Sequence, residues 1–351
     1  MSTREMPAIV CPVPLAVKSH VVLGHGSGGR LSAALMRDIF LPAFGNPVLN
    51  ELNDQAAVRL APGRVAFSTD SYVVKPLFFP GGSIGELAVY GTVNDLAVGG
   101  AEPQYLSAAF ILEEGLPLET LQRVVEQMAV AARRAGVSIV TGDTKVVEKG
   151  NGDQVFITTA GIGVIPDGLM LGPQYVRAGD RILLSGPIGE HGVTILVQRE
   201  GLGVSGELRS DSAPLTELCQ AIVKAAPGLR TMRDLTRGGL SSAMNEIAAS
   251  ARVGMSLEER KIPVSEAVRG ICELFGLDPM YVANEGKLIA IVAPENAEAA
   301  LAAMRTVDTG AGAEMIGTVT SKRPGCVVMR TSFGTDRIVD MLAGDQLPRI
   351  C

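Results

Sequence analysis

The sequence predicts an α/β protein of two domains, in which mixed sheets carry helices packed on them. The chain of 351 residues is too long for one ordinary hydrophobic core and suits two domains that each bury a sizeable interior. Hydrophobic residues make up 47% of it and glycine occupies 41 positions, which is typical of an α/β protein with many turns. In the first half, apolar patterns follow the order ββαβαββ, which predicts α+β layers, a mixed sheet with helices on one face, rather than a doubly wound sheet.

The first domain is predicted to span residues 21–165, after a flexible leader at residues 1–20. Val21–Leu23 is expected to form a very short strand, with a helix at about residues 30–40. The other expected elements are strands near residues 56–60, 64–68, 104–112, 137–141 and 155–164, and helices near residues 84–98 and 118–135. The clearest helix carries Leu118, Leu121, Val124, Val125 and Met128 at helical spacing, and Gly136 follows its last turn.

The second domain is assigned to residues 175–341, after a linker from Pro166 to Ala178. Its expected strands lie near residues 181–185, 281–283, 288–292, 313–319 and 327–330, and its helices near residues 191–199, 215–225, 239–251 and 297–305. Residues 342–351 contain Gly344 and Pro348 and have little apolar periodicity. We therefore expect a mobile tail there, able to extend roughly 30 Å at about 3.3 Å per residue.

Charge and hydropathy exclude several classes of function. The net charge is −6, and neither basic runs nor interleaved aromatic residues occur, so binding of nucleic acid or of an anionic membrane is not expected. No uninterrupted apolar segment is long enough to span a membrane, and Pro7, Pro12 and Pro14 interrupt any signal-peptide pattern. We therefore expect a cytoplasmic protein without a membrane partner.

The cysteines favour reduced thiols. Their number is odd, no CxxC pair occurs, and no zinc-site spacing is present among Cys11, Cys219, Cys272, Cys326 and Cys351. The last of them is the final residue of the tail, where a thiol could reach a distant cleft. With a typical pKa of about 8.5, a few per cent of such a thiol is the nucleophilic thiolate at neutral pH. Cys351 is therefore a candidate carrier, and a chance cysteine in a frayed end is the alternative.

A glycine-rich loop at Gly24–Gly29 formally matches the GxGxxG pattern. We reject a dinucleotide-binding fold, because the preceding strand is too short and no βαβ unit with an acidic residue about 20 positions later follows. Glycines still allow backbone N–H groups to approach phosphate oxygens, and the helix that follows adds favourable partial charge at its N-terminus. The loop is thus a phosphate-binding candidate, and a flexible turn is the alternative.

Four aspartates stand at the ends of apolar runs in the first domain: Asp54, Asp70, Asp95 and Asp143. Carboxylate and phosphate oxygens suit Mg²⁺, so we hypothesise a nucleoside triphosphate bound with magnesium. The GxxxxGK[ST] pattern and the kinase HRD and DFG signatures are missing, which excludes those nucleotide-binding classes. For each aspartate taken alone, a turn or a helix cap is the alternative.

Three further features are candidates for chemistry. Lys145 could reach a phosphate or a substrate oxygen, or be a solvated lysine. Glu285 in Asn284–Lys287 lies between two apolar runs and could be a general base if its surroundings raise its pKa, or part of a plain turn. The Arg233–Gly239 loop could bind phosphate. The alternative is that Thr236 caps the helix that follows. No cluster supports a transition-metal site or a Ser-His-Asp triad, and His20 and His191 receive no assignment.

Taken together, these residues resemble the PurM-like ATP-binding superfamily, which includes aminoimidazole ribonucleotide synthetase, selenophosphate synthetase and thiamine-monophosphate kinase. Within it, they most closely resemble the HypE family of hydrogenase maturation factors. The resemblance runs from Val21 to the end of the chain and is carried by His25–Gly29, Phe67–Val73, Pro76–Gly82, Asn94–Val98, Thr141–Val147, Asn284–Lys287 and Pro348–Cys351. The terminal motif is the most specific, because the sibling families do not end in it.

The resemblance implies an ATP-dependent carbamoyl dehydratase of [NiFe]-hydrogenase maturation. A carbamoyltransferase, HypF, would load a carbamoyl group onto Cys351, and ATP would activate the thiocarbamate so that it loses water and becomes a thiocyanate. Cyanide would then pass to iron on the HypC–HypD complex. The family also implies a homodimer formed by the first domains, with ATP and Mg²⁺ between them under the glycine loop.

The implied site residues fall into three groups. Cys351, Glu285 and Lys145 are the catalytic candidates, with Glu285 as the base and Lys145 stabilising an oxygen or phosphate. The implied nucleotide-binding residues are His25, Gly26, Ser27, Gly28, Gly29, Asp70, Lys75, Asn94, Thr141, Gly142, Asp143 and Thr144, and the implied magnesium ligands are Asp54, Asp70, Asp95 and Asp143. Two alternatives stay open: another enzyme of the superfamily, such as a selenophosphate synthetase, whose reactive cysteine is missing beside this loop, or an assembly scaffold without catalysis.

Overall fold

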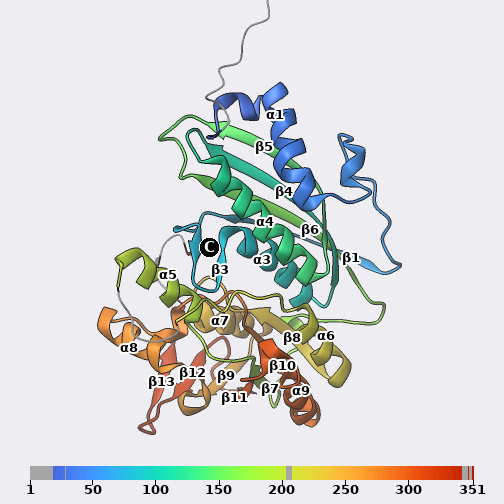
Figure 1. The fold of residues 1–351 in the computed structure, drawn as a ribbon. Helices are drawn as coiled ribbons and strands as arrows, with labels where there is room; N and C mark the ends of the chain where they lie inside the picture. Colours follow the sequence, from blue (N-terminus) through green and yellow to red (C-terminus); the bar gives the residue numbers. More distant parts are fainter. Residues whose placement is uncertain (1–18, 28, 203–207, 342–346, 348–349) are drawn as a thin grey trace, which may run out of the picture.

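The computed structural model describes residues 19–27, 29–202, 208–341, 347, 350 and 351. These residues form two α/β layers, each built on its own sheet, with the C-terminus between them (Figure 1). The prediction of a two-domain fold with mixed sheets is therefore confirmed. Among the described helices, none is both long and apolar enough to cross a membrane.

The first sheet has four strands in the order β1-β6-β4-β5. Their bounds are β1 (Arg64–Tyr72), β4 (Glu102–Glu113), β5 (Ser138–Val147) and β6 (Val155–Ile165). Strands β4 and β5 are parallel, since helix α4 (Leu118–Ala135) carries the chain back between them, and the other pairs are antiparallel. The short strands β2 (Phe78–Phe79) and β3 (Gly82–Ser83) form a separate hairpin.

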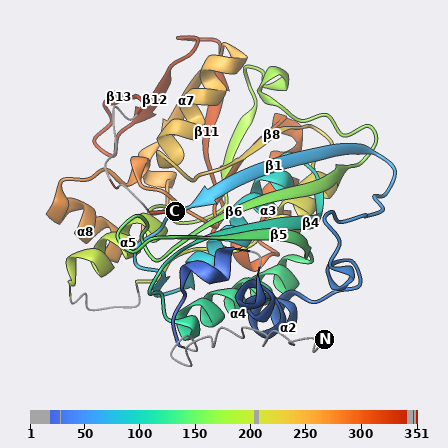
Figure 2. The ribbon, with the colours of Figure 1, turned by 90° about the horizontal axis from the view of Figure 1, so that it is seen from above.

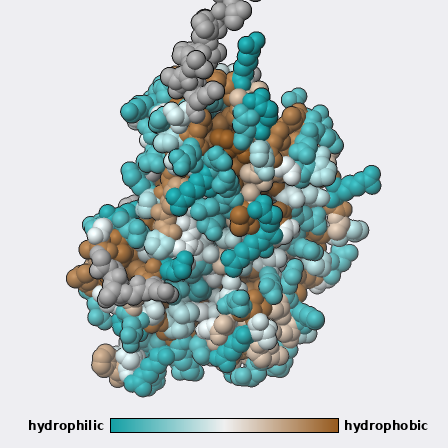
Figure 3. Space-filling view, viewed as in Figure 1, coloured by the Kyte–Doolittle hydropathy of each residue, from teal (hydrophilic) through white to brown (hydrophobic). Residues whose placement is uncertain are grey.

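Helices cover one face of this sheet (Figures 1 and 2). Helix α4 buries the predicted apolar stripe and ends at Gly136, whose φ of 72° lies in the left-handed region that favours glycine. Helix α3 (Ile84–Val98) is buried on nearly all sides, and the Ser83 hydroxyl caps it by accepting the Glu86 N–H. The outward side of this layer is mostly hydrophilic, as expected of helices that bury one stripe (Figure 3).

The expected helix at residues 30–40 is a continuous helical segment of three parts: α1 (Arg30–Leu35), a π-helical turn (Met36–Phe40) and α2 (Leu41–Phe44). It packs beside α4, and the rings of Phe40 and Phe110 lie 5.0 Å apart. The opposite face of the sheet is open to solvent in the described chain: Val65, Phe67 and Ile111 are 58%, 68% and 42% exposed. A sheet face that is open to solvent usually carries polar side chains, so the exposed apolar residues make this face unusual.

The second sheet has seven strands in the order β13-β12-β9-β11-β7-β10-β8. The strands are β7 (Arg181–Leu184), β8 (Leu229–Asp234), β9 (Gly254–Glu258), β10 (Leu288–Val292), β11 (Glu314–Thr320), β12 (Val327–Arg330) and β13 (Asp336–Val339), and the helices are α5 (Glu190–Glu200), α6 (Thr216–Ala225), α7 (Gly239–Ala251), α8 (Glu266–Phe275) and α9 (Ala297–Met304). Helix α7 packs in the core of one face, and α6 and α9 pack in the core of the other.

Helix α3 joins the two layers. Its last residues, Ala97 and Val98, belong to the same apolar cluster as Leu218 of α6 and Leu229 of β8. The Asn94 side chain lies at this junction: its amide N–H donates to the Ala213 carbonyl at 3.1 Å and to the Glu285 carbonyl at 3.4 Å, and its oxygen accepts the Leu215 N–H at 2.8 Å. Residues on α3 are therefore held in place relative to both sheets.

Some predicted elements are wrong or incomplete. Residues 56–60 alternate in burial, as a strand would, but pair with no described strand. In the segment 281–283, Tyr281 ends a 3₁₀ turn that begins at Pro279, and Val282 packs in the cluster between α5 and α8. Val21–Leu23 leads directly into a 3₁₀ turn. The elements that were not predicted include β2, β3, β8, β9, α8 and β13, most of which are short or interrupted by charged residues. Strand β5 is longer than expected, because pairing with β4 carries it through Gly142 and Asp143.

Candidate active site between the two domains

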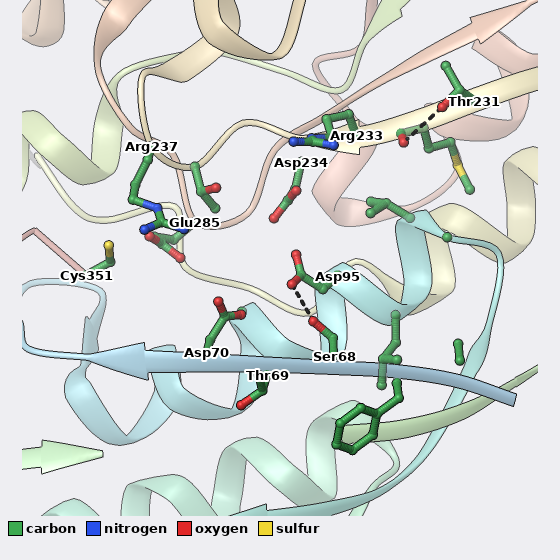
Figure 4. Close-up of a pocket in the computed structure, with 18 of the residues that line it drawn as sticks. Ser68, Thr69, Asp70, Asp95, Thr231, Arg233, Asp234, Arg237, Glu285 and Cys351 are labelled. Atoms are coloured by element: carbon green, nitrogen blue, oxygen red, sulfur yellow. Dashed lines mark hydrogen bonds between the residues drawn. The ribbon is translucent and has the colours of Figure 1, made fainter. Parts of the chain in front are cut away.

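A cleft of about 770 Å³ lies where β1 and α3 of the first layer face β8 and the following loop of the second. Its chemically active lining residues are Asp70, Asp95, Asp234, Arg237, Glu285 and Cys351. In Figure 4 the charged side chains point into one space, and the Cys351 thiol lies at its edge. Asp70 and Asp234 stand at the ends of strands and Asp95 lies on a helix, so these three are held by regular elements of the fold. Arg237 and Glu285 lie in connecting segments.

Two of the predicted magnesium ligands meet here. Asp70 comes from the end of β1 and accepts a hydrogen bond from the Tyr72 hydroxyl at 3.4 Å. Asp95 comes from α3 and accepts one from the Ser68 hydroxyl at 2.7 Å. Burial and the nearby Asp95 raise the pKa of Asp70, although the Arg237 guanidinium opposes this. The pair is therefore a site where positive charge would be favourable.

Asp234, at the end of β8, is a third carboxyl group in the cleft. Burial, followed by repulsion from Asp95, raises its pKa to about 7. The sequence interpretation placed this residue in a phosphate-binding loop and missed it as an acidic site residue. The local signal was weak, since two arginines interrupt the segment Leu229–Arg233 before Asp234, and β8 was not predicted as a strand.

Glu285 is buried at the back of the cleft, where the Asn284–Lys287 segment passes between the two layers. The Asp211 carboxylate fixes this segment by accepting the N–H groups of Glu285 at 3.1 Å and of Gly286 at 3.3 Å. A Cβ at Gly286 would overlap the Asp211 carbonyl oxygen, so only glycine fits there. Burial, with the carboxylates of Asp211 and Asp234, raises the pKa of Glu285 well above its usual value. That is the condition set for a general base.

The terminal cysteine lies at the edge of this cleft rather than away from the protein. Its carbonyl oxygen accepts the N–H of Val73 at 3.0 Å, directly after β1. The preceding residue, Ile350, is only 8% exposed and packs in the core of the first layer. Pro348 and Arg349 of the terminal motif lie outside the described residues. The thiol and the candidate base are thus brought to the same cavity.

A second group of predicted residues lies elsewhere, on the uncovered side of the first sheet. Asp143 and Lys145 on β5 form an exposed ion pair at 2.8 Å, and the hydrogen bond from Lys145 lowers the pKa of Asp143. Thr141, Gly142, Asp143 and Thr144 also line a small apolar pocket on the side of the sheet that the helices cover, together with Phe40 of the π-helical turn and Phe44 of α2. Strands β5 and β1 are the two edges of the sheet, three strand spacings or on the order of 14 Å apart. Within one chain, this group does not reach the cleft.

The glycine loop lies against β5. Gly26 touches this strand so closely that a Cβ would overlap the Val146 N–H, and the Ser27 hydroxyl donates to the Gly24 carbonyl at 3.0 Å. His25 is buried, and its Nδ1 accepts the Val22 N–H at 3.0 Å; burial lowers its pKa. Gly29 precedes α1, and Gly28 lies outside the described residues. The loop therefore lies beside Thr141–Lys145 of β5.

The remaining predicted residues lie outside the cleft. Asp54 is exposed in an irregular segment, and Lys75 pairs with Asp153 at 3.3 Å beside a separate pocket. The Asn94 amide is occupied by the domain junction. Across the described ranges, no three His, Cys, Asp or Glu side chains are grouped closely enough to hold a metal ion by themselves.

Comparison with known proteins agrees with this architecture. Residues 52–165 match the model of the AIR synthase related protein, N-terminal domain, and residues 177–329 match the model of its C-terminal domain. The fold and its interdomain cleft therefore define a protein of the two-domain AIR synthase related class.

Carbamoyl dehydratase HypE of Azotobacter vinelandii is 58% identical over 331 residues, covering 94% of this chain and 97% of the relative. The chain belongs to the HypE family of carbamoyl dehydratases, which are hydrogenase maturation proteins. This membership does not support the selenophosphate synthetase or the non-enzymatic scaffold.

Solved structures of this family superimpose on the chain. A HypE in complex with ATP gives a TM-score of 0.91 at 50% identity, covering 94% of this chain and 99% of that one. A HypE–HypF complex gives a TM-score of 0.77 at 44% identity, covering 88% of this chain and 100% of the matched one.

The raised pKa of Asp234 predicts how stability changes with pH. Because the folded-state pKa of about 7 lies above the unfolded value, the folded protein binds the extra proton between about pH 4 and 7, and this contribution to stability is lost as the pH rises. We expect Asp234→Asn to gain stability relative to the parent across this window, by at most about 1.4 kcal/mol per pH unit. Urea unfolding at several pH values measures the difference. Asp38→Asn is the control, since the pKa of Asp38 is lowered and its titration lies below the window. A flat difference for Asp234→Asn would contradict the interpretation.

Proposed function

We propose that this protein removes the elements of water from a carbamoyl group held on Cys351, using ATP, and leaves a thiocyanate on the sulfur. The observation that carries the proposal is the terminal thiol at the edge of a cleft that also contains the buried Glu285. Family membership and the solved HypE with ATP support the reaction and the nucleotide.

The cleft fits a magnesium-bound phosphate group. Mg²⁺ in nucleotide sites is usually held by one or two carboxylates together with phosphate oxygens, so Asp70 and Asp95 would supply enough protein ligands. Arg237 and the following glycines at the start of α7 would face the phosphates. We propose this pair as the magnesium site of one chain, and Asp143 and Asp54 stay predictions for this role.

The chain's own groups can account for the proton transfers. When ATP is bound, it supplies the phosphoryl group that converts the carbamoyl oxygen into a good leaving group. As the oxygen attacks the γ-phosphorus and the bond to ADP breaks, one N–H proton goes to Glu285. The carbon–oxygen bond then breaks, the second N–H proton leaves with the phosphate, and the C≡N bond is complete. Burial and the neighbouring carboxylates raise the pKa of Glu285, so its ionised form binds a proton more strongly than an ordinary carboxylate does.

Loading and delivery need partners. We propose that HypF transfers the carbamoyl group to the Cys351 sulfur, which the solved HypE–HypF complex supports. Cyanide would then pass from the thiocyanate to iron on HypC–HypD. Because cyanide leaves with both electrons of the sulfur–carbon bond, restoring the thiol also needs two electrons and a proton, which we propose a dithiol supplies as it becomes a disulfide. We propose a cytoplasmic location, since ATP and reduced thiols are available there and no disulfide joins the cysteines in the described residues; cell fractionation would check it.

We also propose a homodimer formed through the uncovered sheet face. This face presents Phe67 near one edge and Ile111 beside the Asp143–Lys145 pair at the other, and a second copy would cover its apolar surface. The β5 residues Thr141–Lys145 and the glycine loop of one chain could then serve a nucleotide bound at the cleft of the other. We propose accordingly that residues 21–165 form the dimerising domain, 175–341 the second domain, and 342–351 the carrier tail, with 1–20 as a leader.

Intact-mass analysis tests the reaction directly. We expect incubation with HypF, carbamoyl phosphate and ATP to place one carbamoyl adduct on the chain, and the isolated adduct to lose the mass of one water only when Mg-ATP is then added. Cys351→Ala should carry no adduct, whereas Cys326→Ala should behave as the parent, because Cys326 lies away from the cleft. Adding iron-loaded HypC–HypD together with a dithiol reductant should return the parent mass. An adduct that persists on Cys351→Ala would exclude the proposal.

Replacing the proposed base should separate loading from dehydration. We expect Glu285→Gln to accept the carbamoyl group at the parent rate but to lose water about 100- to 10,000-fold more slowly, the range typical of a general base. Glu298→Gln on the exposed side of α9 is the matched control. Single-turnover measurements on preloaded protein give the rate, and an unchanged rate for Glu285→Gln would remove Glu285 from the mechanism.

A charge on the uncovered sheet face should break the dimer. We expect Phe67→Glu to reduce the mass measured by light scattering to that of one chain, because a carboxylate would be buried at the proposed interface. Phe333→Glu places the same charge on an exposed phenylalanine of the second domain and should stay dimeric. Equal masses for the two variants would argue against this interface.

A further inference from the structure

A buried histidine contacts the chain terminus and has no part in the proposed chemistry. His191, in the first turn of α5, is 0% exposed. Its Nε2 lies 2.6 Å from the Ile350 carbonyl oxygen, and its Nδ1 lies 2.8 Å from the Ser210 hydroxyl. The residue that it contacts immediately precedes the carrier cysteine. His191 is thus in hydrogen-bond contact with the main chain of the residue directly before Cys351.

The partners of His191 define its tautomer. A carbonyl oxygen can only accept, so Nε2 carries the proton and donates to Ile350. The Ser210 hydroxyl accepts the Ser212 N–H at 3.2 Å and can donate its own proton to Nδ1. Burial lowers the pKa of His191, although Asp211 opposes this, and the neutral ring is therefore favoured. Its ring meets Phe79 edge-on at 5.6 Å, which leaves little freedom to turn.

The residue after His191 also makes room for the end of the chain. Gly192 follows His191, and a Cβ there would lie 2.6 Å from Val282 Cγ1 and 3.3 Å from Leu347 Cδ1. The missing side chain leaves room for Leu347 against the α5–α8 cluster. Ile350 is buried in the other layer, and the Cys351 carbonyl oxygen accepts the Val73 N–H. Both domains therefore hold the end of the chain by specific contacts.

We infer that His191 is a positioning residue that docks the carrier end of the chain, holding the Ile350 carbonyl so that the Cys351 thiol faces the cleft. This inference rests on the proposed function in one respect: the docked state is the state that dehydrates. Loading needs the opposite state, because a transferase must reach a sulfur that is partly buried here. A stronger contact between His191 and Ile350 would therefore favour dehydration, and a weaker one would favour loading.

If His191 positions the end of the chain, its loss should raise the rates of alkylation and carbamoylation and lower the rate of dehydration. A merely structural role would not move these rates in opposite directions. We compare the parent with His191→Leu, which removes the donor, and His191→Gln, whose amide can restore it. Three rates are measured: alkylation of Cys351 by iodoacetamide, read by peptide mapping; carbamoylation by HypF; and single-turnover dehydration of preloaded protein. We expect alkylation and carbamoylation of His191→Leu to rise by about tenfold, the order expected for losing one buried hydrogen bond, and dehydration to fall. Gln should move all three rates back towards the parent.

A variant of the tail keeps the test decisive if His191→Leu does not fold. Leu347→Ala weakens the same dock from the other side, without changing a residue of α5, and should raise the alkylation rate likewise. His20→Leu, at an exposed histidine, is the control and should match the parent. Unchanged alkylation in folded His191→Leu, or in Leu347→Ala, would overturn the inference, as would a fall in all three rates together. Alkylation needs neither HypF nor ATP, so a failure of the proposed reaction would be seen separately.

Discussion

Repulsion among carboxyl groups that share a partly buried cleft is the constraint on which this site depends. Asp70, Asp95, Asp234 and Glu285 come from both layers, and each of the three with a shifted pKa is raised by burial and by its acidic neighbours. Within the lining, Arg237 opposes the effect only in part. Such a group of acids stays together only when the surrounding elements hold it. It favours the binding of cations, whose positive charge would offset the repulsion among these carboxyl groups.

The fold determines this arrangement through a few contacts between distant segments. Asp211 accepts two backbone N–H groups beside Glu285, and Asn94 fixes α3 to the same junction. The ends of β1 and β8 supply the other two acids from separate sheets. No single motif therefore contains the site. It exists only where the two layers meet, and the terminal thiol reaches it from a third direction.

Much of the fold could be predicted from the sequence, because local periodicity determines it. Helix α4 shows this best: its apolar stripe and Gly136 predict both bounds. Where tertiary pairing decides, prediction was incomplete. Residues 56–60 have a strand pattern without a described partner strand, and β5 continues through Gly142 because β4 pairs with it.

The candidate site was only partly predictable for the same reason. Asp70, Asp95, Glu285 and Cys351 were identified as residue types and meet in the cleft. Their separation from Asp143 and Lys145 depends on the strand order β1-β6-β4-β5, which no local pattern reveals. Asp234 was missed because its strand was missed. The contact of His191 with Ile350 joins residues 159 positions apart, and composition contains no signal for it.

The way helix α3 is buried also limits which parts of the molecule can move. Its end lies in the apolar core of the second layer, and the Asn94 hydrogen bonds cross the same boundary. A hinge motion that separated the layers would expose this apolar surface and break those bonds together, so it is strongly disfavoured. The two domains then behave as one rigid body with a preformed pocket. In the proposed reaction, access of partners to the sulfur would then depend on release of Ile350 and Cys351 from their contacts, as with a swinging arm on a fixed base.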